Sequence, residues 1–172
     1  MRVLVALDRT QRAAEAARAL ANWAKETNAE IHLLHVLHPE QIPETAAASG
    51  FTHALTPGGT FSGQTLNVHE PYPKLAEDRT QAIARATAET EDDLRNIAQR
   101  FFPTLTVTTH VEPSRDTAAQ IVKEATRIDA DFIAMSTRGR HGIGSALFGS
   151  IHDEVVRQAK VPVLLIGPEA GA

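Results

Sequence analysis

Short apolar runs that alternate with amphipathic helical patterns constrain the fold of this chain more than any other feature. All but the third run are almost continuously apolar, which is typical of strands that are covered on both faces. The runs are Arg2–Leu7, Glu30–Leu37, Leu105–His110, Asp131–Met135 and Pro162–Ile166. They predict the strands of a buried sheet.

The segments between the runs show the spacing of helices with one apolar face. In the first of them, alanines and Leu20 form a single apolar stripe. The expected helices are Gln11–Thr27, Lys74–Phe102, Thr117–Ile128 and Ser150–Ala159. Strands that alternate with helices imply right-handed crossovers and a parallel sheet. The predicted fold class is therefore an open α/β sandwich with helices on both faces.

Size and composition set limits on the class of protein. A chain of 172 residues has the length of one domain, here residues 1–172. The net charge of −4 argues against a general nucleic-acid binder, and the lack of cysteine excludes disulfides and thiolate chemistry. The first apolar run is too short for a signal peptide, and no run approaches the roughly 20 residues that span a bilayer. We expect a soluble cytoplasmic protein that has no contact with membranes.

The segment from about residue 39 to 73 interrupts the alternation. It is rich in glycine and proline and has no sustained periodicity. Connections of this length are usually either disordered or functional. We expect a long flexible excursion, and a lid over the carboxyl edge of the sheet is the alternative.

The glycine-rich segment from Ser136 to Ile151 lies between the fourth expected strand and the last helix. Ligands of open α/β sheets bind beyond the carboxyl ends of the strands, and a helix N-terminus there favours phosphate. The segment lacks the lysine of a Walker loop and the GxGxxG pattern of dinucleotide sites. From spacing alone it is either a phosphate cradle or an ordinary glycine-rich loop.

The same segment resembles the carboxyl-terminal signature of the universal stress protein family. ATP-binding members carry two glycines and then, after a longer spacer, Gly-Ser or Gly-Thr. Here Ser136, Gly139, Gly149 and Ser150 occupy these positions, so Ser136 replaces the first glycine. The runs VLVALD, LLHVLHP and PVLLI also resemble strands of the family, although Arg9-Thr10 stands where Gly-Ser is usual. The resemblance implies five parallel strands in the order 3-2-1-4-5.

The resemblance also implies an adenine-nucleotide site. Asp8 would face the ribose or a magnesium ion bound to the nucleotide, and its alternative role is to cap the following helix. Ala6, Leu7 and Val36 would line the adenine pocket. The full set of expected binding residues is Ala6, Leu7, Asp8, Val36, Met135, Ser136, Gly139, Arg140, Gly149, Ser150 and Ile151. Arg138 and Arg140 either add charge at the phosphates or are simply solvated.

The other polar residues do not predict a metal site or a catalytic site. His32, His35 and His38 alternate faces of a strand, so they do not converge on one metal ion. The acidic cluster that begins at Glu89 is typical of a solvated helix face. No nucleophile–base arrangement such as GxSxG is present. Whether the chain is an enzyme stays open, and magnesium between Asp8 and a triphosphate would support at most slow hydrolysis.

The expected function is that of a stress-response switch that binds ATP or AMP and is sensed by a regulatory protein partner. The alternative is a nucleotide-free interaction module of the same fold, which Arg9 and Ser136 favour. The family also implies a homodimer. The edge strand at 162–166 is the expected interface, since an exposed apolar edge invites pairing.

Overall fold

The computed structural model describes residues 1–8, 11–43, 78–136 and 151–167. Its five strands form one all-parallel sheet in the order β3-β2-β1-β4-β5. This confirms the predicted fold class and strand order. The strands are β1 Arg2–Ala6, β2 Glu30–Leu37, β3 Val107–Pro113, β4 Phe132–Ser136 and β5 Val163–Ile166.

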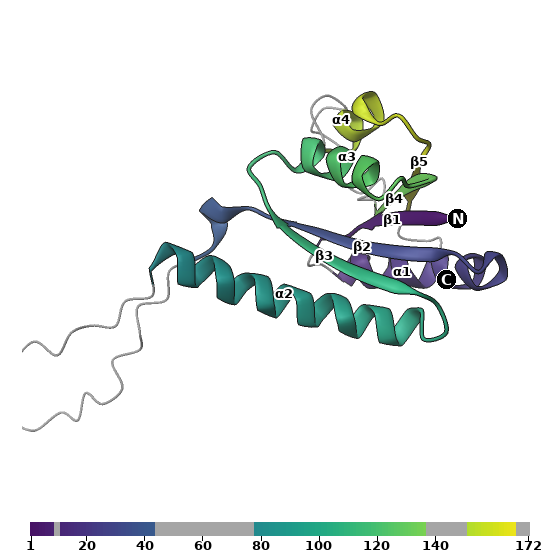
Figure 1. The fold of residues 1–172 in the computed structure, drawn as a ribbon, viewed down its shortest axis with the longest axis horizontal. Helices are drawn as coiled ribbons and strands as arrows, with labels where there is room; N and C mark the ends of the chain where they lie inside the picture. Colours follow the sequence, from purple (N-terminus) through teal and green to yellow (C-terminus); the bar gives the residue numbers. More distant parts are fainter. Residues whose placement is uncertain (9–10, 44–77, 137–150, 168–172) are drawn as a thin grey trace, which may run out of the picture.

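The helices cover both faces of the sheet, as predicted. In Figure 1, α1 and α2 lie on one side of the sheet, and α3 and α4 lie on the other. Their bounds are α1 Gln11–Thr27, α2 Arg79–Phe101, α3 Thr117–Arg127 and α4 Ile151–Gln158, with the 3-10 helix η1 at Pro39–Gln41. None of the helices in the described ranges is long and apolar enough to cross a membrane.

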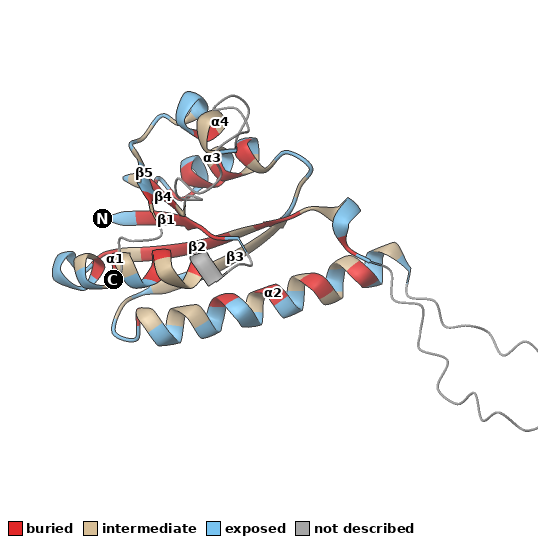
Figure 2. Ribbon diagram, turned by 180° about the vertical axis from the view of Figure 1, so that it is seen from behind, coloured by how far each residue is buried: buried red, intermediate tan, exposed pale blue. Residues whose placement is uncertain are grey.

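Continuous apolar runs form the central strands because both of their faces are buried. Val3 and Val5 of β1 and Leu33 of β2 pack toward α1 and α2. The alternate residues Leu4 and Leu34 pack toward α3 and α4. Figure 2 shows the buried residues concentrated in the sheet and on the helix surfaces that face it. The side-chain alternation of a strand thus supplies two apolar layers from one sequence.

The third strand begins and ends later than its apolar pattern predicts. The expected range was Leu105–His110, whereas β3 runs from Val107 to Pro113. Its pairing with β2 continues from Ile31 opposite Val107 to Leu37 opposite Pro113. As an edge strand with a largely half-exposed surface, β3 carries polar residues that weaken the apolar signal.

The excursion is described only at its start. Of the segment expected at about 39–73, residues 39–43 are described and the remainder lies outside the described residues. The Arg79 guanidinium donates to the carbonyl of Ile42 at 2.9 Å, and that of Arg85 donates to the carbonyl of Pro43 at 3.3 Å. Helix α2 begins at Arg79, five residues after the expected Lys74. A capping box between Asp78 and Gln81 fixes this start. Two arginines of α2 therefore hold the chain that follows β2.

Candidate functional site

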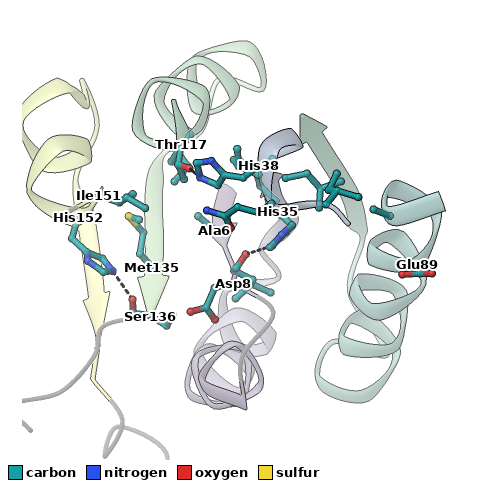
Figure 3. A pocket seen from close by; sticks show the side chains of 18 of the residues that line it. Ala6, Asp8, His35, His38, Glu89, Thr117, Met135, Ser136, Ile151 and His152 are labelled. Atoms are coloured by element: carbon teal, nitrogen blue, oxygen red, sulfur yellow. Dashed lines mark hydrogen bonds between the residues drawn. The ribbon is translucent and has the colours of Figure 1, made fainter. Parts of the chain in front are cut away.

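A cavity of about 690 Å³ opens at the carboxyl ends of β1, β2 and β4 (Figure 3). Its volume falls in the usual range of small-ligand sites, roughly 300–1,000 Å³. It lies at the edge where ligands of open α/β sheets bind. Residues of η1, α2, α3 and α4 complete its walls.

The structure brings together every expected binding residue that it describes. Ala6, Leu7, Asp8, Val36, Met135, Ser136 and Ile151 all line the cavity. The other four, Gly139, Arg140, Gly149 and Ser150, lie outside the described residues, as do Arg138 and the pair Arg9-Thr10. Contact of these residues with a nucleotide stays a prediction.

Strand register explains why residues so far apart in sequence meet here. Ala6 of β1 pairs with Leu34 of β2 on one side and with Met135 of β4 on the other. The next backbone amide, that of Leu7, donates to the carbonyl of Leu34 at 2.9 Å. Because parallel strands end at the same edge, the residues that follow them share one opening.

The three histidines of β2 and its end contact different elements, although His35 and His38 both line the cavity. His35 lines the cavity and donates from Nδ1 to the carbonyl of Leu7 at 2.8 Å. Nε2 of His38 lies 2.7 Å from the hydroxyl oxygen of Thr117, at the start of α3. His32 instead stacks on His110 of β3, with ring centroids 5.4 Å apart. Within the described residues no group of three or more candidate ligands could hold a metal ion.

One wall of the cavity comes from α2, which the sequence did not predict. Arg85 and Glu89 form an ion pair at 3.2 Å, and both line the cavity beside Pro43. Glu89 was expected on a solvated helix face. Its side chain is indeed about half exposed, but it also forms part of the cavity wall. Helical periodicity identifies the apolar face of α2 and carries no signal for where its polar face meets a ligand site.

His152, in the first turn of α4, is a second residue that sequence reasoning missed. Its Nε2 lies 2.7 Å from the backbone oxygen of Ser136, the last residue of β4. Both residues line the cavity, and Figure 3 shows the bond between them. Its position two residues after Ser150, within the expected helix, is the only signal that could have pointed to it.

The pKa values of His110, Glu124 and Arg127, on β3 and α3 away from the cavity, are shifted. The carboxylate of Glu124, which is only 2% exposed, accepts a hydrogen bond at 2.8 Å from Nε of Arg127. This hydrogen bond is the main reason why the pKa of Glu124 is lowered. Burial is the main reason why the pKa of His110 is lowered, although nearby Glu124 opposes this. This network tethers the edge strand to α3 and belongs to the fold.

Solved structures with the same architecture include nucleotide complexes. The universal stress protein UspA from Lactobacillus plantarum matches with a TM-score of 0.63 at 19% identity, over 96% of this chain and 97% of that chain. A universal stress protein from Archaeoglobus fulgidus in complex with dAMP matches with a TM-score of 0.52 at 18% identity, over 96% and 97%. One in complex with cAMP matches with a TM-score of 0.57 at 15% identity, over 98% of both chains. At these identities the likeness establishes the fold.

Sequence comparison establishes the family. Stress response protein NhaX of Bacillus subtilis (strain 168) is 26% identical over 176 residues, a match that covers 96% of each chain. The model of the universal stress protein family matches residues 1–56 and 43–167. Together these matches span nearly the whole sequence, and the chain belongs to the universal stress protein family.

Proposed function

We propose that this protein binds an adenine nucleotide, ATP or AMP, in the cavity at the carboxyl edge of its sheet and acts as a nucleotide-dependent switch in a stress response. The observation that carries the proposal is the meeting of an apolar surface, a carboxylate and a helix N-terminus at one opening. Ala6, Met135, Asp8 and Ile151 represent these three features. The complexes of related folds with dAMP and cAMP support the same ligand class.

The base, the ribose and the phosphates of such a nucleotide would contact different parts of the cavity. The apolar floor of Ala6, Leu7 and Val36 suits a base, and the backbone groups of Val36 would read its edge. Asp8 suits the hydroxyl groups of the ribose. The phosphates would extend toward α4, since a helix N-terminus attracts anions. Gly139, Arg140, Gly149 and Ser150 lie in the segment between β4 and α4 and would contribute mostly backbone amides.

A magnesium ion fits this arrangement through Asp8. Magnesium usually binds one or two carboxylates together with phosphate oxygens and water. Asp8 is a cavity-lining carboxylate at the end of β1, so it would hold the ion against a nucleotide phosphate. Bound magnesium would neutralise phosphate charge, while the residues of this chain fix the position of the nucleotide. Hydrolysis, if it accompanies binding, would be slow and would act as a timer.

A switch requires more than binding. A ligand shifts a protein between two conformations only if it binds one of them better than the other. Gln41, Ile42 and Pro43 lie in the cavity wall and belong to the start of the excursion after β2. A nucleotide that contacts this wall would favour one arrangement of the excursion, and a regulatory partner would recognise it.

Isothermal titration of ATP and AMP in the presence of magnesium tests the proposal. Wild type should bind, Gly149→Leu should not, and Asp8→Asn should bind about tenfold or more weakly because it loses charge-assisted hydrogen bonds. Asp92→Asn is the matched control, since this exposed carboxylate pairs with Arg95 on α2 outside the cavity lining. Absence of binding by wild type would refute the proposal.

That result would favour the alternative, a nucleotide-free module that works through its dimer surface. The described part of β5 pairs with β4 alone, at the end of the strand order. Leu164 and Leu165 on this strand are 45% and 44% exposed. We propose that the protein is cytoplasmic and that this edge forms a homodimer interface, whichever of the two functions holds.

A further inference from the structure

The candidate cavity extends beyond the expected binding residues to a wall formed by α2. Ala86 of this helix shares a buried apolar cluster with Leu37, at the end of β2, and with Ile42. The same stretch of α2 carries Arg85 and Glu89, and both line the cavity together with Ala86. These three residues, Arg85, Ala86 and Glu89, form the α2 wall. The packing of Ala86 at the end of β2 sets where the two charged side chains stand.

The strand order places the α2 wall at one end of the cavity. β1 lies between β4 and β2 in the sheet. The cavity therefore runs from Ser136 of β4, past Asp8 at the end of β1, to the end of β2 and the α2 wall. Figure 3 shows Glu89 on the opposite side of Asp8 from Ser136 and His152. A nucleotide with its phosphates toward α4 and its ribose at Asp8 would point its base toward β2 and Glu89.

The carboxylate of Glu89 is held in place by its neighbour on the same wall. Nη1 of Arg85 donates to Oε1 of Glu89 at 3.2 Å, and Nη2 of Arg85 donates to the carbonyl of Pro43 at 3.3 Å. Arg85 thus joins the carboxylate to the chain that follows β2. An ionised carboxylate only accepts hydrogen bonds, and its two oxygens offer about four positions for them. One bond from Arg85 leaves capacity for a donor on the ligand.

Adenine carries such a donor on its edge. Its 6-amino group has two hydrogens, whereas the ring nitrogen N7 beside it only accepts. The backbone of Val36 would take one of the two hydrogens in the proposed complex, and the second would be available to Glu89. A purine without the amino group offers no hydrogen at this position.

We propose that Glu89 is a specificity-determining residue that accepts a hydrogen bond from the 6-amino group of the bound base, so that the site selects nucleotides of 6-aminopurines. The inference rests on the proposed function, because it takes the ligand to be a nucleotide with its phosphates toward α4. Contacts with the ribose and the phosphates are common to all purine nucleotides and take no part in this selection.

The test is calorimetric titration of AMP and of purine riboside 5′-monophosphate, which differs from AMP only in lacking the amino group. The measured quantity is the preference for AMP, the ratio of the two dissociation constants. The proteins are wild type, Glu89→Ala and Glu91→Ala. Glu91 is the matched control, because it also forms an ion pair on α2, with Arg95 at 3.3 Å, and lies outside the described cavity lining. A change in charge acts equally on both nucleotides and cancels in the ratio.

We expect Glu89→Ala to lower the preference for AMP about tenfold, the effect of losing one hydrogen bond to a charged group. The affinity for purine riboside 5′-monophosphate should stay within about twofold of that of wild type, since this nucleotide has no hydrogen for Glu89 to accept. Glu89 is half-exposed on a helix, so its replacement by alanine should leave the fold intact, and retained binding of the analogue shows this directly. Glu91→Ala should keep the wild-type preference.

The outcomes separate this inference from the function on which it rests. If wild type binds neither nucleotide, the proposed function fails. If wild type binds both with equal affinity, nucleotide binding stands and recognition of the amino group is refuted. If wild type prefers AMP and Glu89→Ala keeps this preference, the role of Glu89 is refuted. An equal loss of preference in Glu91→Ala would also refute it, because the effect would then not be specific to the α2 wall.

Discussion

At the scale of single residues, replacing Leu33 tests how much a buried side chain of the sheet contributes to the stability of the core. It lies in β2 with no exposed surface, among the apolar residues packed between the sheet and α1 and α2. We expect Leu33→Ala to lower the free energy of unfolding by about 3 kcal/mol, because it loses buried apolar area and leaves a cavity. Urea denaturation measures this loss of free energy. Val156→Ala, at an exposed position of α4, should change the free energy of unfolding by less than about 0.5 kcal/mol. Equal effects of the two substitutions would contradict the assignment of Leu33 to the core.

Which residues of the candidate site the sequence could predict depends on how they reach the cavity. Ala6, Asp8 and Ser136 are at strand ends, and apolar runs mark where strands end. Arg85 and His152 reach the cavity from helices. Their positions depend on how closely each helix packs on the sheet, which is set by tertiary contacts and not by the local pattern. The residues at strand ends were predicted. Of those on helices, Ile151 was expected from the family resemblance, whereas Arg85 and His152 were not predicted.

At the scale of elements, the attachment of β3 to α3 makes stability depend on pH. The pKa of His110 is lowered from its ordinary value of 6.5, and that of Glu124 is lowered from 4.5. For both groups the unfolded chain binds protons more readily than the folded one, so stability falls as the pH falls. The contribution of His110 is complete above about pH 6.5 and is lost as the pH drops toward its lowered value. That of Glu124 is lost below 4.5.

The denaturant midpoint, measured from about pH 7.5 down to about pH 5, should therefore decrease in wild type. His110→Gln removes the titrating ring, so we expect a flatter decrease below pH 6.5. Identical slopes in the two proteins would show that His110 does not contribute. Neither the shift nor the network is visible in the sequence, because His32, His110 and Glu124 meet only through the pairing of β2 with β3 and the packing of α3.

At the scale of the whole molecule, the alternation of strands and helices was sufficient to predict the parallel sheet. The strand order needed the resemblance as well, because right-handed crossovers allow more than one order for five strands. Ala6 pairs with both Leu34 and Met135, so β1 lies in the middle of the sheet and β5 lies at an edge. Leu164 and Leu165 of β5 are exposed at this edge, and in the proposed dimer a second copy of the chain would cover them.

The proposed dimer gives the last prediction. In a two-fold symmetric interface each substitution occurs twice, so Leu165→Lys places two charges at the contact between the β5 edges. Burying unpaired ammonium groups is costly, and we expect the variant to be a monomer by multi-angle light scattering where wild type is a dimer. Val163 packs partly against the core of the α3 and α4 face, so its substitution would also disturb the fold. Leu165 is exposed, which makes it the cleaner position. Arg95→Ala, which removes an exposed ion pair on α2, should leave the dimer intact. A dimer that persists in Leu165→Lys would place the interface elsewhere, and a monomeric wild type would remove the dimer from both proposed functions.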